Sequence, residues 1–171
     1  ALLGAGAYVA APHFFGGVTS AGADYQAPPP QMRRITEAQY RNSIADVFSP
    51  EISVVGRFEP DVRIEGLAAV GSTSASISSS GYEHYYAIAG RVADQVVSDT
   101  HWDEFMPCDA SARDVYDEAC ARRLVDLYGE QLLRRDLAEG EVNDWVAVTE
   151  AAHKKLGDFH QAVGLAIEGM L

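Results

Sequence analysis

The sequence is poor in basic residues. Its 171 residues include 13 lysines and arginines against 25 aspartates and glutamates, which gives a formal net charge of −12. Proteins that bind nucleic acids or anionic membrane surfaces present basic patches to the phosphates. The charge balance therefore argues against either as the main partner, and we predict no nucleic-acid partner.

The sequence also lacks the short motifs that identify common active sites. It has no G-x-S-x-G, G-x-G-x-x-G, Walker or H-E-x-x-H pattern, and no C-x-x-C-H haem-attachment motif. None of the five histidines has close metal-ligand spacing on a helix face, although His153 and His160 are a weak candidate pair across Gly157. We predict no metal site and no cofactor bound by this chain, and catalytic residues stay unknown.

Cysteine is scarce, because Cys108 and Cys120 are the only two. In a reducing compartment they would be small buried hydrophobes or a redox pair, but the spacing is not that of C-x-x-C. Cys108 follows Pro107 in a predicted loop and Cys120 lies near a predicted helix start. A disulfide there would stabilise the fold by about 3 kcal/mol, and we predict it for an oxidising compartment.

Residues 1–30 contain no lysine or arginine and a single acid, Asp24. The apolar run from Ala1 to Phe15 is interrupted by Pro12 and is shorter than the roughly 20 residues of a membrane-spanning helix. It is typical of the apolar part of a secretory signal or of a signal-anchor remnant. The large apolar side chains available for a membrane or a partner are Leu2, Leu3, Tyr8, Val9, Phe14 and Phe15.

Three uses of this N-terminal arm stay open. Residues 1–17 could contact a membrane, dock in a groove of a partner, or lie on the same or a neighbouring subunit. Residues 20–30 end in three prolines and are typical of an extended linker. We therefore divide the chain into residues 1–30, an arm with a Pro-rich linker, and residues 31–171, a helical domain that we expect to fold without the arm.

The pattern from residue 36 onward is helical. Thr36 to Gln39 is a capping box, and the helix that follows ends before Pro50. Residues 50–79 lack a helical period and indicate one long ordered loop, and Ser80 then opens a second capping box. Later helices are predicted over 120–135, around 142–152 and from Asp158 onward. The predicted fold is mainly α, with about five helices around one core, an extended N-terminal arm and one long ordered loop.

Two apolar groups on these helices could bind partners. Tyr82, Tyr85 and Tyr86 could stack against a ligand, although packing in the core or an interface is the favoured interpretation. The last helix has an apolar stripe and no terminal cap. We therefore predict that it contacts another polypeptide or a continuation of the same chain through Phe159, Val163, Ile167, Met170 and Leu171, so that residues 31–171 belong to a longer polypeptide or an assembly.

Five segments in order resemble one family. They are Arg33 to Phe48 (RRITEAQYRNSIADVF), Phe58 to Asp61 (FEPD), Cys108-Asp109 with Cys120 to Arg123 (CARR), Leu133 to Val142 (LRRDLAEGEV), and Phe159 to Leu171. They resemble the N-terminal helical region of large exported multidomain proteins of unknown function from planctomycetes, myxobacteria and some proteobacteria, which often carry c-type cytochrome domains. The chain departs from that pattern at Glu65 to Ala69 and at Asp136.

The resemblance implies an exported or periplasmic, multidomain and redox-associated protein, with any haem in a partner or a further domain. Our first hypothesis is a non-catalytic helical module or subunit of a larger exported, redox-associated protein or complex. A second is part of an enzyme whose active site is completed by a C-terminal region. A third is a membrane-anchored accessory subunit of an electron-transfer or other membrane complex.

Overall fold

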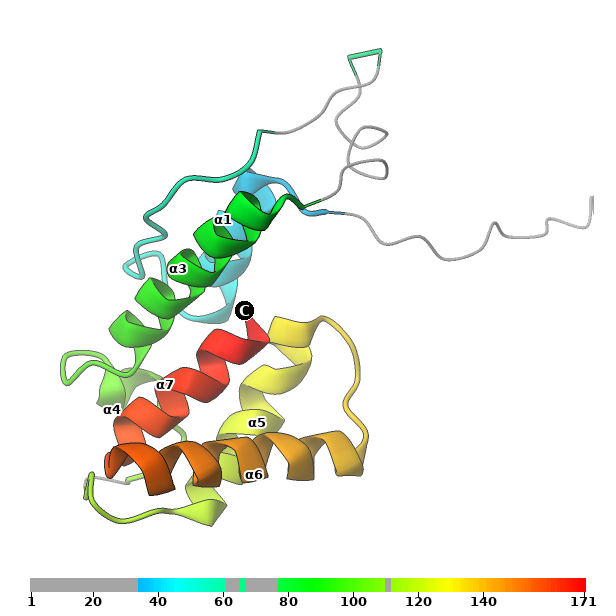
Figure 1. Ribbon diagram of the computed structural model, residues 1–171. Coiled ribbons are helices and arrows are strands. Elements are labelled where there is room, and N and C mark those ends of the chain that lie inside the picture. The colour runs from blue at the N-terminus through cyan, green and yellow to red at the C-terminus, as the bar shows by residue number, and fades with distance from the viewer. Residues whose placement is uncertain (1–33, 61–64, 67–76, 110–111) are drawn as a thin grey trace, which may run out of the picture. The chain divides into compact units, whose positions relative to one another are not determined.

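The computed structural model describes residues 34–60, 65–66, 77–109 and 112–171. The predicted arm, including its six large apolar side chains, lies outside these residues. The described part contains six helices and no strand, so the mainly α prediction is confirmed. In chain order these are α1 (Glu37–Val47), α3 (Ser79–Val96), α4 (Trp102–Phe105), α5 (Glu118–Leu133), α6 (Glu139–Leu156) and α7 (Phe159–Met170) (Figure 1). The four-residue α4 is a helix that the sequence pattern did not predict.

Local capping chemistry sets most of the helix ends. Thr36 and Gln39 form the predicted capping box, each side chain accepting from the other residue's backbone N–H, and Asp158 accepts from the N–H of Gln161 at the start of α7. Gly157 ends α6 in the left-handed region at φ 68°, where glycine is favoured. The cap of α3 is Ser78 and not Ser80, because the Ser78 hydroxyl accepts from the N–H of Gly81.

Helix α7 is the central helix of the core and packs against α3, α5 and α6 (Figure 1). Its apolar residues occur on most of its circumference, as expected of a helix covered on several sides. Phe159, Val163 and Ile167 are fully buried and Met170 is 3% exposed. The expectation that this stripe is left open for a partner is therefore wrong for these four residues, because other helices of the same domain cover it.

Helical spacing in the sequence predicts a buried stripe on α5, and this prediction needs one correction. The predicted stripe consists of Cys120, Leu124, Leu127, Tyr128 and Leu132. Cys120, Leu124 and Tyr128 are buried as expected, whereas Leu127 is 45% exposed. Val125 is buried instead and completes the inner face of the helix together with Ala121. The buried arc is therefore rotated away from Leu127, toward the positions that face α6 and α7.

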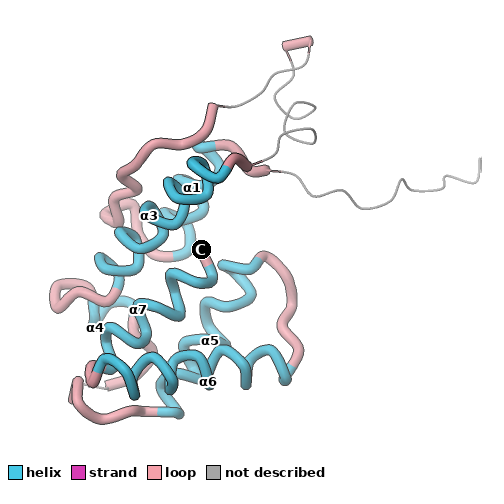
Figure 2. Tube along the Cα trace, in the orientation of Figure 1, coloured by secondary structure: helices cyan, strands magenta, loops and turns pink. Residues whose placement is uncertain are grey.

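Residues 50–60, the first described part of the long loop, lie along α1 and α3 (Figure 2). Gln95 of α3 accepts from the backbone N–H of Ser53 at 2.8 Å and donates to its carbonyl at 2.9 Å. Gly56 is required by close approach, because a Cβ there would lie 2.3 Å from Cγ1 of Ile88. This segment is thus ordered by side chains of α3 and not by a backbone ladder.

Candidate functional site

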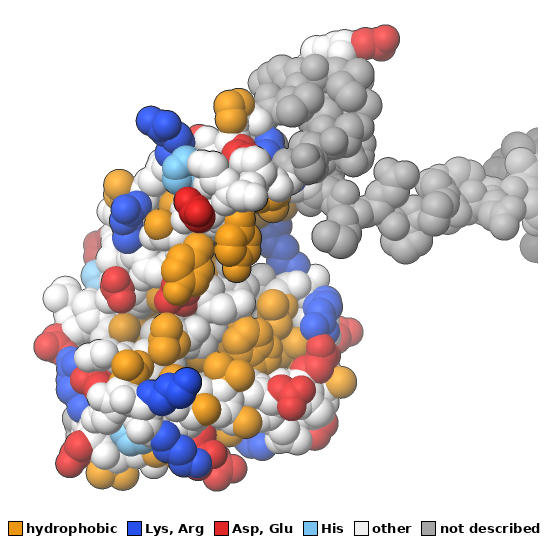
Figure 3. Space-filling view, in the orientation of Figure 1, with side chains coloured by type: hydrophobic (Ala, Val, Ile, Leu, Met, Phe, Trp, Pro, Cys, Tyr) orange, Lys and Arg blue, Asp and Glu red, His pale blue; other side chains and the backbone are white. Residues whose placement is uncertain are grey.

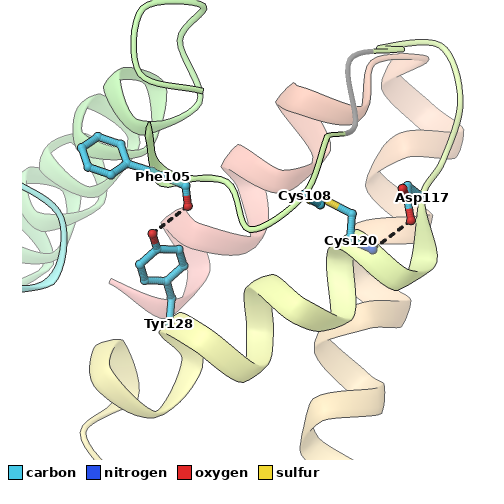
Figure 4. Close-up of a disulfide and its surroundings, with 5 residues drawn as sticks. All are labelled: Phe105, Cys108, Asp117, Cys120 and Tyr128. Atoms are coloured by element: carbon cyan, nitrogen blue, oxygen red, sulfur yellow. Dashed lines mark hydrogen bonds between the residues drawn. A yellow bond between two sulfur atoms is a disulfide. The ribbon is translucent and has the colours of Figure 1, made fainter. Parts of the chain in front are cut away.

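The first candidate feature is the disulfide between Cys108 and Cys120, whose Cα atoms are 5.6 Å apart. Figure 4 shows it joining the segment after α4 to the first turn of α5. Asp117 accepts from the backbone N–H of Cys120 at 2.8 Å, and the Tyr128 hydroxyl donates to the carbonyl of Phe105 at 2.7 Å. Since such bonds persist in oxidising compartments, this one indicates an exported environment.

The second feature is a hollow of about 580 Å³ between the segment before α1, helix α3 and the end of α7. We call it the tyrosine groove. Its lining consists of Arg34, Ile35, Tyr40, Ile77, Tyr82, Tyr85, Tyr86, Ala89, Arg134, Leu165, Glu168, Gly169 and Leu171. Figure 3 shows hydrophobic side chains gathered over α3 and α7 on the viewed face. Concave, mainly apolar sites with a few polar groups are the usual form of a binding site.

Three tyrosines of α3 form one wall of the groove. They lie three and four residues apart and so share one helix face. Tyr82 is 66% exposed and Tyr86 is 59% exposed, whereas Tyr85 is half-buried with its ring 5.7 Å from that of Phe58. Core packing, one of the two uses favoured from the sequence, is therefore wrong for Tyr82 and Tyr86, which point their rings toward solvent.

Two tyrosines of the groove, Tyr40 and Tyr86, have raised pKa values. Glu168 raises the pKa of Tyr86 through its negative charge and through a hydrogen bond with the phenol. Burial, followed by the neighbouring Tyr85, raises the pKa of Tyr40 to about 12. Both phenols are therefore neutral at physiological pH, and a neutral Tyr86 hydroxyl can donate to the Glu168 carboxylate.

Arg34 is a structural part of the groove wall. Its side chain is only 8% exposed, and it contacts the Glu59 carboxylate at 2.8 Å and donates to the carbonyl of Pro60 at 2.6 Å. Hydrogen bonds from Ser78, and the charge of Arg34, lower the pKa of Glu59. Glu59 therefore stays ionised and links the segment before α1 to the cap of α3.

Arg134, directly after α5, also lines the groove. It has a left-handed backbone at φ 56° and donates to the Ser43 hydroxyl of α1 at 2.6 Å. Arg134 also lines a second, smaller hollow of about 50 Å³, which it shares with Ile35, Tyr40 and Leu171. It is thus a cation that borders both hollows.

The residues that the sequence singled out lie in different parts of the structure. Of the predicted interface residues, Leu171 lines the tyrosine groove, and the others lie in the core. The His160 ring stacks on Trp102 with centroids 3.3 Å apart, and His153 lies beside Tyr116. Within the described ranges no three His, Cys, Asp or Glu side chains are grouped to hold a metal ion.

Sequence reasoning missed Ile77, Arg134, Leu165 and Glu168 as members of one site. Leu165 is 43% exposed although it lies between the fully buried Val163 and Ile167. An apolar residue out of phase with a helix's buried stripe is a signal that the sequence does contain. Among the described helices, none combines the length and apolar character that a membrane crossing requires.

Comparisons with known proteins cover part of the chain. Residues 33–98 match the model of a family described as PSD3, a protein of unknown function (DUF1587). This match contains α1, the long loop and α3, and with them the tyrosines of the groove. No curated protein matches the chain significantly. No solved structure matches it significantly either.

Proposed function

We propose that this chain is a non-catalytic helical module of a larger exported protein or complex and that the tyrosine groove binds a protein partner. The observation that carries the proposal is the exposure of large apolar side chains around one hollow. Tyr82, Tyr86, Ile77 and Leu165 are 66%, 59%, 53% and 43% exposed around about 580 Å³. Grouped exposure of this kind marks interaction surfaces, whereas single exposed apolar residues do not.

The side chains of the groove suit protein recognition. Tyrosine supplies a large rigid area with few rotatable bonds, and it is enriched among the residues that dominate interface energies. In this proposal the Tyr86 hydroxyl donates to the Glu168 carboxylate beside it, and this restrains the ring before binding. Less conformational entropy is then lost on association, so the same contact area gives tighter binding.

The biological setting follows from two further observations. The Cys108–Cys120 disulfide supports an exported location, and we propose the periplasm or an equivalent compartment. The resemblance of five segments to exported proteins with c-type cytochrome domains supports a redox-associated complex. In that complex the partner is a separate subunit or a further part of the same polypeptide, and any haem belongs to the partner. Contact of residues 1–17 with a membrane is a separate proposal that rests on their composition.

Site-specific photo-cross-linking tests the proposal. A benzophenone amino acid in place of Tyr82, in protein produced with its native partners, should cross-link to one defined polypeptide segment. Val148 on α6 is 46% exposed and lies outside the groove, so the same substitution there is the matched control. Adding Leu165→Asp should remove the cross-link at position 82, because it places a charge on the apolar wall.

Two outcomes would contradict the proposal. Equal cross-linking at positions 82 and 148 would show that the groove is not a preferred contact surface. Absence of a cross-link at position 82 in the intact protein would show that the groove stays in water. A cross-link to a segment of the same polypeptide or to another subunit would support it, and mass spectrometry of the product distinguishes these two sources.

A further inference from the structure

Arg134 occupies a backbone position that ordinarily belongs to glycine. As the residue that ends α5, it has φ 56° and ψ 37°, and its backbone N–H donates to the carbonyl of Glu130. A side chain with a Cβ is disfavoured in this left-handed region, which is why glycine or asparagine usually ends a helix in this way. Arginine therefore has a conformational cost here that glycine would not have.

Within the described residues, Arg134 donates a hydrogen bond but has no carboxylate partner. Its neighbour in the structure is the neutral hydroxyl of Ser43, at 2.6 Å. Among the described arginines, those that pair with a carboxylate are Arg34, Arg41, Arg113, Arg122 and Arg135. Arg134 has no such pair in the described residues, although the chain has 25 acidic residues against 13 basic ones.

The other cation of the groove is already paired. Arg34 contacts the Glu59 carboxylate at 2.8 Å, whereas Glu168 lies beside the neutral hydroxyl of Tyr86. Arg134 is thus the groove cation whose charge is left for a ligand, and Ile35 and Leu171 beside it lower the local polarity. A guanidinium in such a place pairs well with a carboxylate, which it can bind with two parallel hydrogen bonds.

We infer that the segment bound in the tyrosine groove is an acidic and apolar one: apolar side chains pack on Tyr82 and Tyr86, and an aspartate or glutamate of the same segment pairs with Arg134. This inference rests on the proposed function, and it adds the chemistry of the partner. The alternative is that Arg134 has only a structural role, in which it links α5 to α1 through its hydrogen bond with Ser43. Arg134→Gly distinguishes the two roles, because glycine adopts the left-handed backbone conformation without strain and lacks the charge.

Peptide display against the whole chain of residues 1–171 tests the inference with a defined probe. Selected peptides should combine aromatic or aliphatic residues with an acidic residue at a fixed spacing. Selection against Arg134→Glu should exchange that acid for lysine or arginine at the same spacing. Proline-rich peptides without an acid, or the same acidic peptides on both proteins, would overturn the inference while leaving the groove as a binding surface.

Binding of the best selected peptide, followed by fluorescence anisotropy, gives the quantitative test. Arg134→Gly should weaken binding by about tenfold or more, because a charge-assisted pair is lost, while the melting temperature stays the same or rises. Ser43→Ala keeps the charge and should change the affinity by about twofold or less. If Arg134→Gly lowers the melting temperature but leaves the affinity for the peptide unchanged, Arg134 has the structural role and not the binding role.

A separate variant shows whether the proposed function itself is wrong. The double variant Tyr82→Ala, Tyr86→Ala should lose the selected peptide whatever its charge, since the apolar wall is gone. If this variant binds as well as wild type, the peptides occupy another surface, and both the proposed function and the inference fall. If the double tyrosine variant loses binding but Arg134→Gly keeps it, the inference about the acidic residue is wrong and the proposed function stands.

Discussion

Two substitutions on one turn of α7 distinguish core from surface on this helix. Ile167 is fully buried, whereas Leu165, two residues away, is 43% exposed and lines the tyrosine groove. Replacing either with aspartate makes nearly the same chemical change. We predict that Ile167→Asp unfolds or strongly destabilises the domain and that Leu165→Asp leaves its folding intact.

The magnitude for Ile167→Asp follows from two costs. Losing the buried side chain removes roughly 1.5–3 kcal/mol of transfer free energy. A buried carboxyl group must also be neutral at pH 7, about three units above its ordinary pKa, and this costs about 4 kcal/mol. The sum, roughly 6 kcal/mol, is comparable to the whole free energy of unfolding of a typical domain. For the exposed Leu165 the expected change is about 0.5 kcal/mol.

Urea denaturation followed by circular dichroism measures both effects. Ile167→Asp should lack a native baseline at pH 7, or its midpoint should be strongly lowered, and the penalty relative to wild type should shrink as the pH falls toward 4. This sign follows because the carboxyl group would have a raised pKa in the folded state, and such a group contributes stability only at low pH. Leu165→Asp should keep the wild-type midpoint.

A single result would refute this reasoning. If Ile167→Asp and Leu165→Asp had equal midpoints near that of wild type, the stripe of α7 would be accessible to water in the isolated chain. The expectation from the sequence, that this stripe is an interface with another polypeptide, would then be correct, and the packing of α7 against α3 and α6 would be wrong.

Two further predictions concern stability. The double variant Cys108→Ala, Cys120→Ala should have a free energy of unfolding about 3 kcal/mol below that of wild type, because the bond closes a loop with a sequence separation of 12. Thiol titration of the unfolded, unreduced wild type should find no free thiol. Two free thiols would contradict the bond. Hydrogen bonding to Arg135 lowers the pKa of Glu141 from 4.5 to about 2, so its contribution to stability should be lost as the pH falls from 4.5 toward 2. Melting curves should show a shallower loss over this range for Glu141→Gln, and parallel curves would contradict it.

Local features of the fold were predictable because the interacting atoms are close in sequence. The capping box of Thr36 and Gln39 spans three residues, and the caps at Asp158 and Gly157 depend on the adjacent turn. Cys108 and Cys120 were predicted as partners because they are the only cysteines and their segments are neighbours. The mainly α class followed in the same way from periodicity within single segments.

The tyrosine groove was not predictable, because its walls come from distant parts of the chain. Arg34 and Glu59 are 25 residues apart, and Arg134 reaches Ser43 across 91 residues. No spacing rule connects such positions. The tyrosines themselves could be seen in the sequence, but their exposure depends on what α1 and α7 leave uncovered.

By itself the sequence determined most of the helices, several of their caps and which cysteines can pair, since each of these depends on chemistry within a few turns of chain. Only the tertiary structure decided which apolar face is covered. On α7 it placed Val163 and Ile167 in the core and left Leu165 in the groove. The physical reason is that burial depends on the neighbours of a side chain in space, and here those neighbours belong to helices far apart along the chain.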